Sequence, residues 1–237
     1  MNPHFDEKAN ELLWTLLQMG GKAGTMLKAA MQVIADRNPA PVEEILRLED
    51  EVDGLQLRVD EEAIRLTALA QPVASDVRFL FMASRMAHEI ERIADKCVSI
   101  GRHGVSLAHV QRLPRTLDLP AMGEIASTML RSSLDALLER DCGLAESVLA
   151  QEDKIDAYRD RVIDNLMIGG MESGEEVRRT LWLALVARAL ERIGDHASNI
   201  AEDVIYLVRG QDVRHRRPAA HPEAEPIDAT DGDFDRA

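Results

Sequence analysis

Four pairs of carboxylates, each a Glu followed by an Asp four residues later, are the side chains in this sequence best suited to chemistry. Two pairs fall in each half of the chain: Glu49/Asp53 and Glu91/Asp95, then Glu152/Asp156 and Glu191/Asp195. A spacing of four places both side chains of a pair on one face of a helix, about 6 Å apart. Carboxylate oxygens in the absence of thiol ligands favour iron, manganese, magnesium or calcium over zinc, although zinc stays possible. The pattern therefore predicts surface metal ions or clusters of open identity.

The same pairs also allow an interpretation in which they bind no metal. The chain contains 42 acidic residues, so an acidic pair four residues apart is often only a solvated helix face. Arg92 and Arg192, which directly follow two of the glutamates, would then simply neutralise them. The recurrence of the pairs at matching places favours the metal, but shared ancestry explains part of that match.

The elements that carry these pairs come from a duplication. Residues 91–95, Glu-Arg-Ile-Ala-Asp, return 100 positions later as Glu-Arg-Ile-Gly-Asp at 191–195. A second match, shifted by 103, relates Glu49–Asp53 to Glu152–Asp156. A repeat this long is typical of a duplicated helical bundle rather than a solenoid.

Apolar spacing predicts an all-α protein built from two tandem three-helix bundles, with six long helices. We expect helices at about 5–36, 42–69, 75–100 and beyond, 118–141, 143–168 and from about 174 to 207. Prolines at 114 and 120 mark the division, which gives a first bundle at 1–113 and a second at 114–211. Residues 212–237 are rich in Pro, Asp and Ala, which predicts a disordered acidic tail. The apolar stripe Met86–Ile90–Ile93–Cys97 lies opposite Glu91 and Asp95, so these acids are expected on an outer face.

Charge and composition exclude several functions. A net charge of −14 disfavours binding to nucleic acid or directly to an anionic membrane surface. No export signal or membrane-spanning apolar run is visible, and Cys97 and Cys142 lack disulfide or zinc spacing, so we expect a soluble cytoplasmic protein. The sequence shows no supported nucleophile–base pair and no phosphate-cradling loop, which predicts that the protein is not an enzyme.

The segment from Glu191 to Val208, ERIGDHASNIAEDVIYLV, resembles the PhoU family of bacterial phosphate-signalling regulators, and so does Gln71–Arg78, QPVASDVR. The likeness covers residues 5–211. It implies a fold of two similar three-helix bundles and a negative regulatory role that couples a phosphate ABC transporter ATPase to a sensor histidine kinase. Any association with the membrane would then pass through those partners, and we expect a homodimer.

The resemblance also implies multinuclear metal clusters bound through Glu/Asp-x-x-x-Asp motifs on the bundle surface. The matching positions are the four pairs named above: Glu49, Asp53, Glu91, Asp95, Glu152, Asp156, Glu191 and Asp195. The first copy has Lys96 where the second has His196, which predicts weaker metal binding in the first copy. Two alternatives remain: a metal-storing or di-metal carboxylate bundle, disfavoured because no Glu is followed by His three residues later, and a metal-free helical adaptor.

Overall fold

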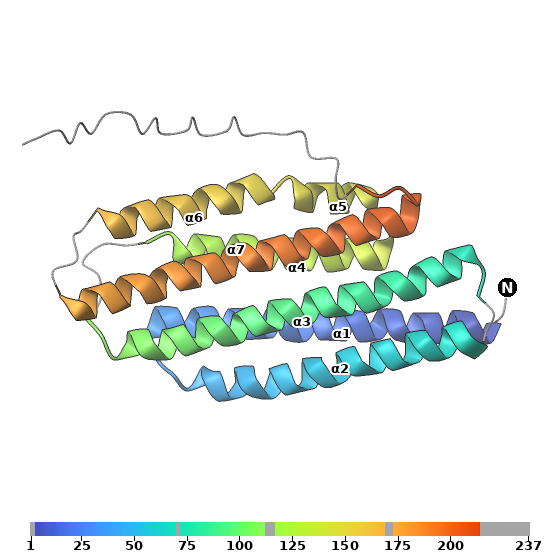
Figure 1. Ribbon diagram of the computed structural model, residues 1–237, viewed down its shortest axis with the longest axis horizontal. Coiled ribbons are helices and arrows are strands. Elements are labelled where there is room, and N and C mark those ends of the chain that lie inside the picture. The colour runs from blue at the N-terminus through green and yellow to red at the C-terminus, as the bar shows by residue number, and fades with distance from the viewer. Residues whose placement is uncertain (1–2, 70–71, 112–116, 169–172, 214–237) are drawn as a thin grey trace, which may run out of the picture.

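All regular secondary structure in the part of the chain that the structure describes is helical, which confirms the predicted all-α class. The computed structural model describes residues 3–69, 72–111, 117–168 and 173–213. Within these ranges the first half contains three long helices, and the second half contains four helices: α1 (Pro3–Asp36), α2 (Pro41–Leu69), α3 (Ala74–Ala108), α4 (Leu119–Glu139), α5 (Cys142–Leu149), α6 (Glu152–Met167) and α7 (Gly174–Arg209). All run along the long axis of the molecule (Figure 1).

Local sequence accounts for most helix ends. Pro41 occupies the first position of α2, where its missing N–H costs nothing. Ser173 and Glu176 form a capping box at the start of α7, and Gly210 closes that helix in the left-handed conformation, with φ of 69°. At the start of α3 only half of such a box forms. The carboxylate of Asp76 accepts a hydrogen bond from the Val73 N–H at 3.3 Å, but Val73 has no side-chain acceptor to complete the box.

The helix expected to run unbroken from 143 to 168 is divided into α5 and α6, so that prediction is wrong. Ala150 and Gln151 keep right-handed backbone angles, but their ψ values of −9° tighten the chain into a turn. The N–H of Gln151 bonds to the Val148 carbonyl at 2.9 Å, a three-residue rather than a four-residue bond. This turn allows Val148 on α5 and Ile155 on α6 both to reach the core.

One hydrophobic core passes through both halves of the chain. In the first half α3 packs against α1 and α2, and in the second α7 packs against α4, α5 and α6. The halves join mainly where α3 and α7 lie side by side, and α1 also contacts α4 (Figure 1). The guanidinium of Arg78 at the start of α3 lies 5.6 Å from the ring of Tyr206 near the end of α7, so these two helices are antiparallel.

The division into bundles at 1–113 and 114–211 stays a prediction, because residues 112–116 lie outside the described residues. The same holds for most of the tail predicted to be disordered, from 214 to 237. None of the described helices combines the length and the apolar character needed to cross a membrane.

Candidate functional site: paired carboxylate clusters

The four acids of the first half face one another across α2 and α3. We call them the first cluster: Glu49 and Asp53 on α2, with Glu91 and Asp95 on α3. Burial and the neighbouring negative charges of Asp53, Asp50 and Asp95 raise the pKa of Glu49. Burial, Asp95 and Asp50 raise the pKa of Asp53 in the same way. Two helices therefore bring together like charges that repel one another, as the spacing in the sequence predicts.

The second half repeats this arrangement across α6 and α7. The second cluster comprises Glu152 and Asp156 on α6 with Glu191 and Asp195 on α7. The pKa of Asp195 is raised by burial, then by the charge of Glu191, while Arg192 opposes the shift; Asp156 and Glu152 add to it. All four acids of this cluster are thus close enough to interact electrostatically.

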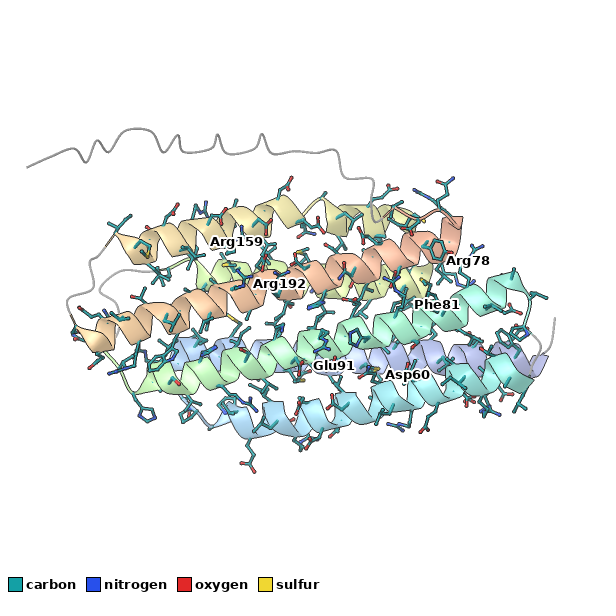
Figure 2. All side chains as sticks on the ribbon, viewed as in Figure 1. Asp60, Arg78, Phe81, Glu91, Arg159 and Arg192 are labelled. Carbon is teal, nitrogen blue, oxygen red and sulfur yellow. The ribbon has the colours of Figure 1, made fainter. Side chains whose placement is uncertain are left out.

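The glutamates of α3 and α7 lie deeper than the outer-face prediction suggested. The side chain of Glu191 is only 10% exposed and that of Glu91 17%, whereas Asp95 and Asp195 are 39% and 34% exposed. Each glutamate therefore lies at the border between core and surface. In Figure 2, Glu91 lies along the side of α3 that faces α2.

The inner oxygen of each glutamate is buried without a hydrogen-bond partner among the described residues: Oε2 of Glu91 and Oε2 of Glu191. The nearest guanidinium nitrogens, Nε of Arg92 and Nε of Arg192, lie 3.5 and 3.6 Å away, beyond a good hydrogen bond. A buried carboxylate oxygen in this state is costly, and a bound cation would satisfy it. The same orphaned atom recurs at the same place in both halves.

Three arginines donate hydrogen bonds to other carboxylate oxygens of the clusters. Nη1 of Arg92 donates to Asp95 at 3.3 Å, and Nη1 of Arg192 donates to Asp195 at 3.0 Å. Arg159 on α6 donates through Nη1 to Asp156 at 3.2 Å and to Glu191 at 3.0 Å. Arg159 was not anticipated from the sequence, although its spacing of three from Asp156 on one helix is a recognisable signal. Figure 2 shows it on α6, beside α7.

The donor set fits hard or borderline cations, but the side chains as they stand do not enclose one. Within the described ranges, no three His, Cys, Asp or Glu side chains lie close enough together to hold a metal ion. Ligation at the second cluster would require Arg159 to leave the carboxylates that it contacts. Metal binding at either cluster consequently remains a prediction.

The two histidines beside the clusters differ. His88 is half-exposed, with Nδ1 3.8 Å from Oε2 of Glu91. His196 joins the two halves, because its Nδ1 lies 2.8 Å from Oε2 of Glu89 on α3. Asn199 donates to the same Glu89 oxygen at 3.0 Å. Near this link, Nη2 of Arg85 lies 3.2 Å from Oδ1 of the buried Asp203.

Comparisons with known proteins agree with the duplicated helical architecture. The family model of the PhoU domain matches twice, at residues 16–103 and 119–204, so each match falls in one half of the chain. A phosphate-specific transport system accessory protein PhoU homologue of Pseudomonas putida is 32% identical over 216 residues, which is 91% of this chain and 84% of that protein. The accessory protein PhoU of Escherichia coli is 28% identical over 89% of this chain and 88% of its own length.

Solved structures agree in three dimensions. The crystal structure of PhoU from Pseudomonas aeruginosa superposes with a TM-score of 0.83 and 31% identity, covering 87% of this chain and 100% of that one. That of the phosphate transport system regulatory protein PhoU from Streptococcus pneumoniae gives a TM-score of 0.79 at 24% identity, over 88% and 99% of the two chains, which supports the fold. With matches across both halves and relatives aligned over nearly their full length, this chain belongs to the PhoU family.

Proposed function

We propose that this protein is a cytoplasmic negative regulator of phosphate uptake and of phosphate-starvation signalling. The observation that carries the proposal is the near end-to-end match to accessory proteins of the phosphate-specific transport system, over 91% of this chain for one of them. Because the match includes both helical halves, it concerns the whole protein and not one shared module.

The regulator acts by contact rather than by chemistry. Its partners are the ATPase of the phosphate transporter and a sensor histidine kinase, and it reaches the membrane only through them. The surface supports this mode of action, because Asp95 and Asp195 lie at partly exposed positions that do not exclude water. The net charge of −14 makes direct repression through DNA unfavourable, so an effect on transcription passes through a protein.

Deletion of the gene tests the proposal. In a strain with a reporter for phosphate-starvation genes, deletion is expected to switch the reporter on in phosphate-rich medium, and the intact gene supplied in trans is expected to silence it again. A deletion strain whose reporter stays silent in rich medium would refute the assignment. Light scattering on the purified protein tests the homodimer that we propose as the working form.

We also propose that the two carboxylate clusters bind metal cations at the surface of the bundle. The orphaned Oε2 atoms of Glu91 and Glu191 support this second proposal, as do the raised pKa values within both clusters. Iron, manganese, magnesium and zinc are the candidates, with hard cations favoured by the all-oxygen donor set.

Elemental analysis of protein purified without chelator tests this idea. The variant Glu191→Ala/Asp195→Ala is expected to lose the metal of the second cluster, and Glu91→Ala/Asp95→Ala that of the first. The matched control is Asp135→Ala/Glu139→Ala, an exposed acidic pair with the same spacing on α4, which should retain all metal. Equal metal content in all variants, or none in the parent, would contradict the proposal and favour the metal-free adaptor.

A further inference from the structure

A groove on the surface where α3 meets α7 is lined only by basic and apolar residues. The basic side chains are Arg92 and Lys96 from α3 with Arg188, Arg192 and His196 from α7, and Leu185 and Ala189 complete the lining. Its volume is about 490 Å³. No acidic residue contributes to this lining, although the chain carries a net charge of −14. We call it the basic groove.

The sequence builds this groove from two rows of side chains spaced four apart. On α3, His88, Arg92 and Lys96 follow one another, and Arg92 and Lys96 line the groove; on α7, Arg188, Arg192 and His196 follow one another, and all three line it. A spacing of four keeps each row on one helix face. Every position of each row thus carries a base, and the duplication places the two rows on the two helices that join the halves. Figure 2 shows Arg192 on α7.

The cations of the groove differ in how their charge is compensated. Arg92 and Arg192 each contact two carboxylates of their own cluster, at distances between 3.0 and 3.6 Å. For Lys96 and Arg188, by contrast, the described part of the chain offers no ion pair within 4.0 Å. His196 is already bonded to Glu89. Two positive charges on facing helices are therefore left to solvent and counterions, so an anion placed between them gains Coulomb energy.

The shape and chemistry of the groove narrow the class of anion. Arginine guanidinium groups bind oxyanions through paired, charge-assisted hydrogen bonds, and three of the five basic residues are arginines. The groove is larger than one orthophosphate ion needs, and its charge matches a ligand with several negative charges. A long polyanion such as nucleic acid is disfavoured, because the acidic remainder of the protein would repel everything outside the groove.

We propose that the basic groove is a binding site for a small multivalent phosphate compound, such as pyrophosphate or the triphosphate chain of a nucleotide. The site borders the carboxylate clusters, with which it shares the contacts of Arg92 and Arg192, and it goes beyond the regulatory role proposed above. It would allow the protein to read a soluble phosphorylated compound directly at the junction of its two halves.

Calorimetric titration of the full-length protein tests the site. The protein is first treated with chelator and dialysed, so that no bound metal can bind the phosphate probes. The probes are orthophosphate, pyrophosphate, ATP and sulfate. Lys96→Ala/Arg188→Ala is expected to weaken pyrophosphate binding about tenfold or more, because both uncompensated cations are removed. The matched control, Lys154→Ala/Arg178→Ala, removes one exposed lysine and one exposed arginine elsewhere and should bind like the parent.

The four probes distinguish the possible ligands. Pyrophosphate tighter than ATP would identify an inorganic ligand, and the reverse order a nucleotide. Three results would overturn the proposal. These are no binding of pyrophosphate or ATP to the parent protein, an equal loss of pyrophosphate affinity in the control variant, or sulfate binding as tight as that of pyrophosphate. Circular dichroism on both variants verifies that they are folded, so a loss of binding cannot be mistaken for unfolding.

Discussion

Arg159 on α6 lies 3.0 Å from Oε1 of Glu191 on α7, and this ion pair has no equivalent among the described residues of the first half of the chain. The shift of 103 residues that relates the two acidic pairs on α2 and α6 brings Arg159 onto Gln56. Glu91, the counterpart of Glu191, is contacted only by His88 and Arg92 of its own helix, as far as the described residues show. An arginine thus bridges the two helices of the second cluster, and the described residues show no such bridge in the first cluster.

Substituting Arg159 by Gln, and Gln56 by Arg, tests what the arginine of the second cluster does. Arg159→Gln removes the hydrogen-bonded ion-pair partner of the nearly buried Glu191 and is expected to destabilise metal-free protein by about 1–2 kcal/mol. For a chain of this size, the melting temperature falls by roughly 2–4 °C for each kcal/mol. Added manganese should restore more stability to this variant than to the parent, because the cation replaces the guanidinium.

The reciprocal variant Gln56→Arg is the control. It should stabilise the metal-free protein or leave it unchanged, and it should weaken cation binding at the first cluster. If both substitutions change the melting temperature in the same direction with and without manganese, the pairing of Arg159 with Glu191 has no electrostatic role.

A second prediction concerns repulsion within the second cluster. Burial and the charge of Glu191 raise the pKa of Asp195 above its ordinary value of 3.8. The folded protein therefore holds this proton more tightly than the unfolded chain, so stability is lost as the pH rises through the raised pKa. At pH 7 the penalty is complete, and Asp195→Asn is expected to stabilise metal-free protein by up to about 1 kcal/mol.

Melting curves of parent and Asp195→Asn between pH 3 and pH 8 measure this effect. The gain should disappear well below pH 3.8, where Asp195 is protonated in both the folded and the unfolded parent. Asp135→Asn on α4, which is exposed, is the control and should give no gain at any pH. A variant that is less stable than the parent at pH 7 would contradict the repulsion argument.

A third prediction concerns the link between the halves. Burial acts to raise the pKa of Glu89, but the hydrogen bonds from His196 and Asn199 prevail and lower it below 4.5. A lowered pKa contributes stability above pH 4.5 that is lost as the pH falls through the lowered value. Glu89→Gln is therefore expected to cost about 1–2 kcal/mol at pH 7, and progressively less as the pH falls below 4.5.

Urea titrations at pH 7 and pH 4 would measure both values, with Glu139→Gln as an exposed control. A constant deficit at both pH values would mean that packing, rather than charge, accounts for the loss.

A fourth prediction compares two glycines. A Cβ added at Gly104 on α3 would lie 2.6 Å from Cγ1 of Val33 on α1, whereas one added at Gly21 on α1 meets nothing within 4 Å. Gly104→Ala is expected to destabilise the protein by about 1–3 kcal/mol through overpacking. Gly21→Ala should stabilise it by about 0.5–1 kcal/mol, because alanine loses less backbone entropy in a helix. Equal effects in urea unfolding would show that α1 and α3 do not pack this closely.

The sequence predicted the helical architecture well, because long apolar stripes and proline breaks are local signals. The apolar stripe of α3, made of Met86, Ile90, Ile93 and Cys97, is buried as its spacing indicated. The acidic pairs of each half were also correctly placed on neighbouring helices, because the duplication repeats both pairs at matching positions in the two halves. The division of the fifth expected helix was missed: Ala150 and Gln151 are both compatible with a continuous helix, and no proline or glycine stands there.

The parts that escaped prediction depend on contacts between helices. The ion pair of Arg159 with Glu191 joins residues 32 positions apart, and the bond of His196 with Glu89 joins residues 107 apart. The basic rows on α3 and α7 are visible in the sequence, but only their packing shows that they face one groove. The lower exposure of Glu91 and Glu191 likewise follows from the neighbouring helices α2 and α6, which a single helical projection omits.

The antiparallel packing of α3 on α7 carries a consequence for the origin of this fold. Before the gene was duplicated, a single three-helix unit would have exposed the face of α3 that now contacts α7, and a second copy of the same unit would have offered a matching surface. Such a pair would have been two-fold symmetric, with the axis passing between the two equivalent helices. Gene fusion then made the two halves independent in sequence, so that Lys96 and His196, or Gln56 and Arg159, could diverge. A symmetric dimer has two identical copies of each site, whereas the two halves of the fused chain can carry different residues at equivalent positions.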